Sequence, residues 1–208
     1  NMQELIKGQR AAPVQLEAML RKRFMLLNGT GLTTLAIAGI DMAVWDALGK
    51  ALGAPLATLL GGKVGRVRAY NSTGLGLAGA ARTAAEAVEL LEFGFTAIKL
   101  RLGYPTLEED VAVTRAVMKS VPAGTTVMCD FNQALTATEA LRRGHALDGE
   151  GLYWIEEPTR ADDYEGHARI ARDLRTAVQI GENFWSASDM AKAIAAGSMD
   201  YAMPDLSK

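Results

Sequence analysis

The sequence has few of the features that mark disulfide-rich, nucleic-acid-binding or membrane-spanning proteins. Its single cysteine, Cys129, excludes a disulfide framework within the 208 residues and fits a reducing cytoplasm. The charge is nearly balanced, with 22 basic and 24 acidic residues, and no basic stripe indicates nucleic-acid binding. No uninterrupted apolar run approaches the roughly 18 to 20 residues of a membrane span, and no signal peptide is recognisable. We therefore expect a cytoplasmic globular protein without nucleic-acid or membrane partners.

The first third of the sequence has the periodicity of helices and carries no obvious chemistry. Its pattern predicts, in order, a helix over residues 1–27, a turn over 28–31, a strongly apolar helix over about 32–51 and a short helix over 55–62. Pro13 lies near the start of the first helix, and Asp41, Asp46 and Lys50 are spaced for polar pairing along the second. We interpret this segment as a helical packing unit without catalytic residues.

From Val64 onward the pattern changes to an alternation of short apolar runs and helices. Six strands are predicted, at residues 67–70, 96–100, 125–129, 152–155, 177–180 and 200–203. Five helices are predicted between them, at residues 80–92, 107–121, 136–147, 164–175 and 188–196. This alternation predicts a parallel α/β sheet with functional side chains at the carboxyl ends of its strands. His145 and His167 fall in helices, away from these ends, so we assign them structural roles.

Four acidic residues follow successive predicted strands at nearly regular intervals: Asp130, Glu156, Glu182 and Asp205. The steps between them are 26, 26 and 23 residues, about the length of one βα unit in a parallel barrel. Carboxylates at neighbouring strand ends point into one mouth, where they repel each other unless a cation lies among them. The spacing therefore predicts a hard divalent metal with oxygen ligands. The alternative is that these acids are helix N-caps, a position that Asp favours and Glu does not.

Two cationic residues precede these acids in the chain. Lys99 and Arg101 alternate along one predicted strand, so both side chains are expected to face the same mouth. Beside a metal and a second cation, the pKa of Lys99 is expected to fall toward the range of a catalytic base. The alternative is a structural ion pair. Asn132 is expected to face the mouth within reach of Glu156, and Glu157 to lie behind Glu156 on the other face of the strand.

The predicted sheet is too short to close into a barrel. A closed eight-stranded barrel needs two more βα units than the six strands predicted here. A half-open barrel exposes two apolar edges, which favours aggregation. We expect either that the sequence is part of a longer protein or that another chain covers these edges.

Six motifs occur with a joint spacing along nearly the whole sequence. They are Gly39-Ile40-Asp41-Met42-Ala43-Val44-Trp45-Asp46-Ala47-Leu48-Gly49-Lys50, Lys99-x-Arg101, Asp130-Phe131-Asn132-Gln133, Trp154-Ile155-Glu156-Glu157-Pro158, Gly181-Glu182-Asn183 and Met203-Pro204-Asp205. Together they resemble the enolase superfamily, and within it the mandelate racemase branch of the mandelate racemase/muconate-lactonising group. The resemblance implies a TIM-like, modified (βα)7β barrel beneath an α+β capping domain. Residues 1–65 would be the C-terminal helical part of the cap, and residues 66–208 the first six βα units of an incomplete catalytic barrel.

The resemblance also implies roles for individual residues. It makes Asp130, Glu156 and Glu182 the ligands of Mg²⁺, in agreement with their spacing. Lys99 would neutralise the substrate carboxylate, and Asp205 would orient a catalytic histidine on the next strand. Ser72, Asn132 and Lys208 would bind the substrate or support the site. Members of the family commonly form homo-oligomers, which we also expect here.

Two departures from the family pattern bear on the reaction. Arg101 stands where the family has a lysine that acts as a base, and a guanidinium is essentially always protonated. The histidine partner of Asp205 would lie beyond Lys208. The chemistry implied is removal of the proton α to a carboxylate through a metal-stabilised enediolate. Overall similarity favours racemisation of a 2-hydroxy acid, Arg101 favours one-base dehydration of an acid sugar, and a third alternative is a truncated metal-binding fragment without turnover.

Overall fold

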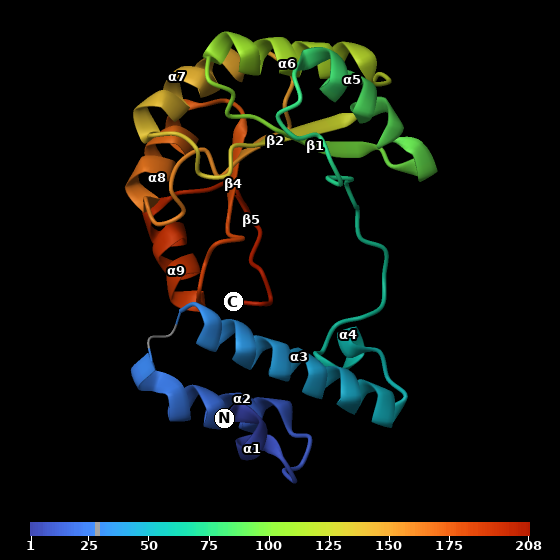
Figure 1. The fold of residues 1–208 in the computed structure, drawn as a ribbon, viewed down its shortest axis with the longest axis vertical. Coiled ribbons are helices and arrows are strands. Elements are labelled where there is room, and N and C mark those ends of the chain that lie inside the picture. Colours follow the sequence, from blue (N-terminus) through green and yellow to red (C-terminus); the bar gives the residue numbers. More distant parts are fainter. Residues whose placement is uncertain (28–29) are drawn as a thin grey trace. The chain divides into compact units, whose positions relative to one another are not determined.

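The structure, a computed structural model, describes residues 1–27 and 30–208 (Figure 1). Asn28 and Gly29, half of the predicted turn, lie outside the described residues. The chain divides into two compact units. One comprises residues 1–67, 184–187 and 205–208, and the other comprises residues 68–183 and 188–204.

The first unit is helical, as the sequence predicts, but its first helix is interrupted. It contains α1 (Met2–Ile6), α2 (Pro13–Phe24), the 3₁₀ turn η1 (Met25–Leu27), α3 (Leu32–Leu52) and α4 (Leu56–Leu59). The single helix predicted over residues 1–27 is therefore wrong. Gly8 has a left-handed φ of 76°, which ends α1, and Pro13 starts α2 at a position where its missing N–H costs no hydrogen bond.

Helix α3 agrees with its predicted bounds to within one residue. It ends at Gly53, whose φ of 60° lets its N–H bond to the carbonyl oxygens of Gly49 and Lys50. Lys50 Nζ pairs with Asp46 Oδ2 at 2.6 Å, as its spacing predicts. By length and composition α3 is apolar enough to cross a membrane, but Asp41, Asp46 and Lys50 interrupt it, and one such helix is a weak indication.

The second unit is built on a five-stranded parallel sheet whose strands follow chain order. The strands are β1 (Ala97–Arg101), β2 (Thr126–Asp130), β3 (Trp154–Glu156), β4 (Ala177–Ile180) and β5 (Tyr201–Ala202). The helices are α5 (Ala80–Glu89), η2 (Glu92–Gly94), α6 (Leu107–Ser120), α7 (Ala137–Leu147), α8 (Tyr164–Asp173) and α9 (Ala187–Ala196). Helices α5 to α8 form a layer along one side of the strands (Figure 1). The predicted parallel α/β architecture is confirmed.

The sixth strand, predicted over residues 67–70, does not form. Asn71, which follows this segment, contacts the sheet: its N–H donates to the Ala97 oxygen at 2.9 Å and its oxygen accepts from the Lys99 N–H at 3.1 Å. Val67 is 91% exposed and lies between two arginines, so this segment has no apolar face to bury against the helices.

The alternation of side chains in the sheet separates its core from its functional face. Ile98 and Leu100 of β1 are fully buried, and the alternation of side chains places both on one face of the sheet. Lys99 and Arg101, which alternate with them along the strand, lie on the opposite face. Arg101 is in register with Asp130, and Asp130 is in register with Glu156. The sheet therefore places these three residues in one row at the carboxyl ends of β1, β2 and β3.

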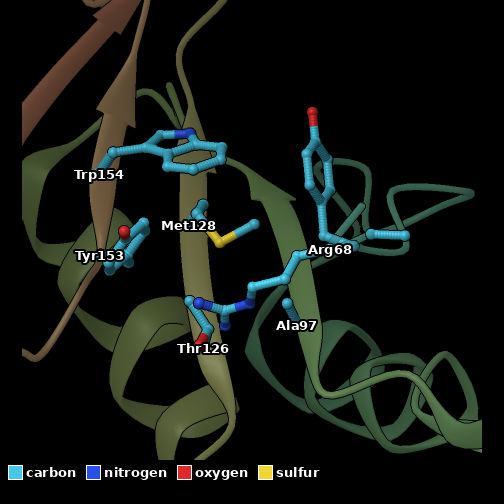
Figure 2. Close-up of a pocket in the computed structure, with 8 residues that line it drawn as sticks. Arg68, Ala97, Thr126, Met128, Tyr153 and Trp154 are labelled. Carbon is cyan, nitrogen blue, oxygen red and sulfur yellow. The ribbon is translucent and has the colours of Figure 1, made fainter. Parts of the chain in front are cut away.

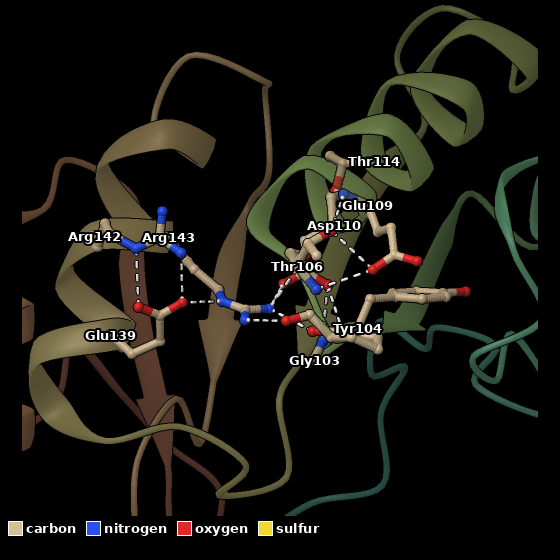
Figure 3. A network of polar contacts seen from close by, with 10 residues as sticks. Gly103, Tyr104, Thr106, Glu109, Asp110, Thr114, Glu139, Arg142 and Arg143 are labelled. Atoms are coloured by element: carbon tan, nitrogen blue, oxygen red, sulfur yellow. Dashed lines mark hydrogen bonds and ion pairs between the residues drawn. The ribbon is translucent and has the colours of Figure 1, made fainter.

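A buried ion pair fixes the loop that follows β1 (Figure 3). Asp110 of α6 accepts the backbone N–H groups of Gly103 and Tyr104 at 2.9 and 3.0 Å, and its other oxygen pairs with Arg143 of α7. Arg143 Nη1 also donates to the Tyr104 carbonyl at 2.7 Å. Arg143 and Asp110 are almost completely buried, so the pair satisfies polar groups that water does not reach.

Candidate metal and substrate site

Lys99 lies between two of the predicted metal ligands. Its Nζ is 2.7 Å from Glu156 Oε1 and 3.2 Å from Asp130 Oδ2. The three side chains are 11%, 0% and 7% exposed, in the order Lys99, Glu156 and Asp130. One ammonium is thus shared by two buried carboxylates at the ends of adjoining strands, which is a costly arrangement unless the site uses it.

The electrostatics of this group differ from the sequence-based expectation for Lys99. Burial alone would lower its pKa, but the hydrogen bond to Glu156 and the charges of Asp130 and Glu156 outweigh burial and raise the pKa to about 12. The protein's own groups alone therefore shift the pKa of Lys99 upward, because carboxylates and not Arg101 surround the ammonium. The expected fall beside a bound metal and a second cation remains a prediction. Burial raises the pKa of Glu156 to about 7 despite Lys99, with further contributions from Asp130 and Glu182.

Two aromatic residues that the sequence reasoning missed complete the surroundings of Lys99. The Trp154 Nε1–H donates to Glu156 Oε2 at 3.3 Å. The Tyr70 ring centre is 5.7 Å from Lys99 Nζ and meets the Trp154 ring edge to face. Trp154 precedes Glu156 by two residues on the same strand, so alternation along β3 contains the signal for it. Tyr70 lies outside any strand and has no comparable signal.

Glu182, the third predicted ligand, follows β4 after a glycine that no other residue can replace without strain. Gly181 has a φ of 140°, and a Cβ there would lie 2.8 Å from the Met203 backbone nitrogen. Asn183 Nδ2 donates to Glu182 Oε1 at 3.3 Å. The charge of Glu182 contributes to the raised pKa of Glu156, so the two carboxylates act on each other.

The three acids do not form a ready-made metal-binding cluster among the described residues. Within the described residues, no group of three or more His, Cys, Asp or Glu side chains is arranged to hold a metal ion as it stands. Asp130 and Glu156 share Lys99, whereas Glu182 contacts Asn183. The donor set nevertheless fits Mg²⁺, because three carboxylates at or just beyond consecutive strand ends supply the hard oxygen ligands that this ion prefers.

Three residues beside these acids adopt left-handed backbone conformations that non-glycine residues rarely take. They are Asn132, Gln133 and Glu157, with φ values of 43°, 64° and 38°. The Asn132 N–H donates to Asp130 Oδ1 at 2.7 Å, but the expected contact between its side chain and Glu156 is not found in the described part of the chain. Glu157 is 1% exposed, and burial raises its pKa. Such conformations cluster at functional sites.

Arg101 and Ser72 lie near the site without taking part in its contacts. Arg101 ends β1 and is partly buried, and no hydrogen bond or ion pair joins its guanidinium to any described residue. Ser72 is exposed, and its carbonyl oxygen accepts the Gly74 N–H at 3.0 Å. Their predicted contacts with the substrate remain predictions.

Asp205 and Lys208 belong to the other compact unit, so their predicted place beside Lys99 remains a prediction. Asp205 Oδ1 accepts the N–H and the hydroxyl of Ser207 at 2.8 and 2.7 Å, and these bonds lower its pKa. Lys208 Nζ lies 5.5 Å from the centre of the Trp185 ring.

A pocket of about 230 Å³ opens on the same face of the sheet but at its other end (Figure 2). Its lining residues are Arg68, Ala69, Tyr70, Ala97, Thr126, Met128, Tyr153 and Trp154. Ala97, Thr126 and Trp154 are the first residues of their strands. Because parallel barrels place their chemistry at the carboxyl ends of the strands, we assign no reaction to this apolar pocket.

Comparisons with known proteins give a consistent result. Residues 82–208 match the family model for the enolase C-terminal domain, and residues 1–61 match that for the N-terminal domain of mandelate racemase/muconate lactonizing enzyme. The chain is 35% identical to D-galactarolactone cycloisomerase of Agrobacterium fabrum over 85% of its residues. It is also 35% identical to L-talarate/galactarate dehydratase of Salmonella typhimurium over the same share. These alignments cover 47% and 44% of the two enzymes, so the chain spans about half their length.

Two solved structures are similar over almost all of the chain. An enolase from alpha proteobacterium BAL199 with bound Mg²⁺ is 44% identical with a TM-score of 0.95, and the match covers 99% of this chain and 58% of that one. An enolase from Bradyrhizobium in complex with Mg²⁺ and mandelic acid is 36% identical with a TM-score of 0.92, and the match covers 100% of this chain and 57% of that one.

Proposed function

Because the chain belongs to the mandelate racemase/muconate-lactonising family of the enolase superfamily, we propose that it forms part of a Mg²⁺-dependent enzyme that removes the proton α to a carboxylate. The observation that carries this proposal is the position of Lys99 between Asp130 and Glu156. Asp130, Glu156 and Glu182 would hold the ion, which supplies electrostatic stabilisation of the charge that develops on the substrate carboxylate.

Lys99 would act on the substrate as a fixed positive charge. Its ammonium, held between Asp130 and Glu156, would donate hydrogen bonds to the substrate carboxylate. The ammonium side chain is only 11% exposed and lies 5.7 Å from the Tyr70 ring, and its partial burial strengthens its interaction with an anion. Ser72 and Asn132 would contact the carboxylate and the hydroxyl groups of the same substrate.

We assign neither cation of β1 as the base. Lys99 would bind the substrate carboxylate, and Arg101 remains charged at any physiological pH. The base would then be a histidine oriented by Asp205 and supplied from outside these 208 residues, with Lys208 in support. A single base removes a proton from one face of the substrate, whereas racemisation requires a proton donor or acceptor on each face.

The proposed reaction is therefore dehydration of an acid sugar, in which one base removes the α-proton and an acid donates a proton to the β-hydroxyl, which leaves as water. The named activity of the Salmonella relative, a talarate/galactarate dehydratase, supports this choice. Racemisation of a 2-hydroxy acid is the second candidate, because the Bradyrhizobium structure contains mandelic acid. In the dehydratase, Arg101 would bind the substrate, since its guanidinium has no partner among the described side chains.

The full-length protein with Mg²⁺ separates the two reactions. We expect acid sugars to give an α-keto acid, detected as its semicarbazone, and mandelate enantiomers to keep their circular dichroism. Arg101→Lys is expected to introduce exchange with deuterated water of an α-proton that faces β1, on the side of the substrate opposite the histidine, because a lysine can lose its proton and an arginine cannot. Arg160→Lys, at an exposed arginine paired with Asp162, is the matched control. Racemisation of mandelate by the parent protein without any dehydration would contradict the proposed reaction.

A further inference from the structure

Glu157 is a buried carboxylate that receives several hydrogen bonds but has no cation beside it in the described part of the chain. It is 1% exposed. Asn183 Nδ2 lies 2.9 Å from both of its oxygens, and a smaller effect of the Gln133 side chain also favours its charged form. Two amide side chains therefore converge on one carboxylate that the proposed chemistry does not use.

The partners of Glu157 come from three different strand ends. Gln133 follows β2, Glu157 follows β3 directly, and Asn183 follows β4. Backbone bonds join the same segments: the Gln133 N–H donates to the Glu157 carbonyl at 2.8 Å, and the Glu157 N–H donates to the Gln179 carbonyl at 3.0 Å. The turns after the three strands that carry the proposed metal ligands are thus connected through one residue.

The hydrogen bonds continue from Glu157 to the neighbourhood of two proposed ligands. The Asn183 amide nitrogen that bonds to Glu157 also donates to Glu182 Oε1 at 3.3 Å. Gln133 belongs to the turn in which the Asn132 N–H donates to Asp130 Oδ1. The side-chain oxygen of Gln133 accepts the Ala161 N–H at 2.9 Å, so this side chain is held in place within the turn.

The backbone at Glu157 and Gln133 has an unfavourable conformation that other contacts must hold in place. Both residues have positive φ values, 38° and 64°, although neither is a glycine or an asparagine. A conformation of this kind persists only where the surrounding contacts determine it, and it is found mainly at functional sites. The buried hydrogen bonds of Glu157 supply such contacts.

We propose that Glu157 is a positioning residue for the metal site: it holds Asn183 and Gln133, and through them orients Glu182 and the turn after Asp130 for binding a divalent cation. This inference rests on the proposed function. Partners that orient metal ligands are known to affect metal affinity, typically by tenfold to a hundredfold when they are removed. The competing explanation is that Glu157 only stabilises the fold, as any buried and hydrogen-bonded acid does.

The experiment measures Mn²⁺ affinity of the chain by electron paramagnetic resonance in four variants. Glu157→Gln keeps the shape but brings an amide N–H against the donors of Asn183 and Gln133, so at least one contact is lost. Asn183→Ala removes the bond to Glu182, and the third variant combines both changes. Asp148→Asn is the control, because Asp148 is also buried and accepts the N–H groups of Arg175 and Thr176, but it lies before the start of β4.

We expect Glu157→Gln to weaken Mn²⁺ binding by about tenfold or more. Asp148→Asn should lower the thermal stability as much as Glu157→Gln does, but it should leave the Mn²⁺ affinity unchanged. In the Asn183→Ala background, Glu157→Gln is expected to have a smaller effect than in the parent, because both act on Glu182. Parent-like affinity in Glu157→Gln, or an equal loss in Asp148→Asn, would overturn the proposal.

Amide hydrogen exchange without added metal keeps this test separate from the proposed function. We expect Glu157→Gln to speed exchange over residues 131–135 and 181–184, which Asp148→Asn leaves protected. If the parent does not bind Mn²⁺, the proposed function fails, and the exchange comparison still decides whether Glu157 orders these turns. Unchanged exchange there would overturn its positioning role.

Discussion

At the scale of single residues, Lys99 and a bound divalent cation would compete for the same carboxylates. Its ammonium contacts Glu156 and Asp130, the same carboxylates that we assign to Mg²⁺. Two cations that share these oxygens repel each other, whereas the carboxylates need positive charge because they are buried. Lys99 therefore stabilises the protein without metal and opposes the ion when it binds.

Lys99→Met is expected to separate these two effects. Stability without Mg²⁺ should fall, but by less than the roughly 3–5 kcal/mol typical of a broken buried pair. The reason is that Glu156, with a pKa of about 7, can take up a proton near neutral pH. The gain in stability on adding Mg²⁺ should exceed that of the parent, as urea unfolding with and without the ion would measure.

The control for this prediction is Lys50→Met, which removes an exposed ion pair with Asp46. We expect it to change stability by less than about 0.5 kcal/mol and to leave the Mg²⁺ increment as in the parent. A smaller Mg²⁺ increment in Lys99→Met than in the parent would show that the lysine assists the ion and does not compete with it.

His167 is predicted to make the protein sensitive to mild acid. It is fully buried in α8, its Nδ1 lies 3.0 Å from the Asp163 carbonyl, and its Nε2 has no partner among the described residues. Burial lowers its pKa below the usual 6.5, despite the neighbouring carbonyl and charge of Asp163. The unfolded chain therefore binds the proton first, so stability falls as the pH drops through about 6.5 toward the lower value in the folded protein.

Replacement of this imidazole should flatten that dependence. His167→Leu is expected to show a smaller loss of stability between pH 7 and pH 5 than the parent, measured by urea unfolding across that range. His145→Leu, at an exposed position, is the matched control and should keep the parent's slope. Equal slopes for the parent and His167→Leu would contradict the assignment. The sequence places His167 correctly in a helix, but its complete burial depends on packing that periodicity does not describe.

The residues of the site were predictable to different degrees for physical reasons. Asp130 and Glu156 follow apolar runs and end their strands, as their spacing predicts. The direction of the pKa shift of Lys99 was not predictable, because it depends on which side chains on neighbouring strands reach the ammonium. The hydrogen bonds of Glu157 likewise join residues that are far apart in the chain.

At the scale of elements, helices and strands with a clear local signal were predicted well. Thr106 and Glu109 form a capping box at the start of α6, and that helix begins within one residue of the prediction. The break between α1 and α2 and the absent strand at residues 67–70 were missed. A strand exists only where a partner strand and a buried face support it, and the exposed Val67 has neither in the described chain.

Arg143 is buried in a way that the sequence of α7 does not predict. It follows Arg142 in α7, and both pair with Glu139, so the two arginines look alike in the sequence. In the structure, the Arg142 side chain is 56% exposed and that of Arg143 only 6% exposed, because Arg143 reaches Asp110 of α6 (Figure 3). Its contacts link α7 to the loop after β1.

Arg143→Met is therefore expected to destabilise the protein far more than Arg142→Met. Loss of Arg143 leaves Asp110 buried without its cation, which typically costs about 3–5 kcal/mol. Loss of Arg142 removes a surface pair worth about 1 kcal/mol or less. Thermal unfolding of both variants tests this. Adding Asp110→Asn to Arg143→Met should recover part of the lost stability. If it did not, the unpaired charge of Asp110 would not be the cause of the destabilisation.

At the scale of the whole molecule, the order of the strands in the sheet determines which residues come together at the site. Because β1 to β4 lie side by side in sequence order, the residues that follow them come together without long-range rearrangement. That is why spacing along the sequence predicted the acids. Asp205 and Lys208 belong instead to the unit that also contains α2 and α3. Regular spacing along the sequence does not indicate to which compact unit a residue belongs.

Binding of Mg²⁺ is expected to stabilise the molecule through the carboxylates of the second unit. A ligand that binds only the folded state adds about 2.7 kcal/mol at a concentration of one hundred times its dissociation constant. Glu156→Gln should abolish this increment. Its stability without metal should stay near that of the parent, because Glu156 has a pKa of about 7 and a neutral amide resembles its protonated form. The exposed Asp162→Asn is the control and should retain the full increment. If Glu156→Gln gained as much stability from Mg²⁺ as the parent in urea unfolding, the ion would bind elsewhere and the assignment of this strand end to a metal would be wrong.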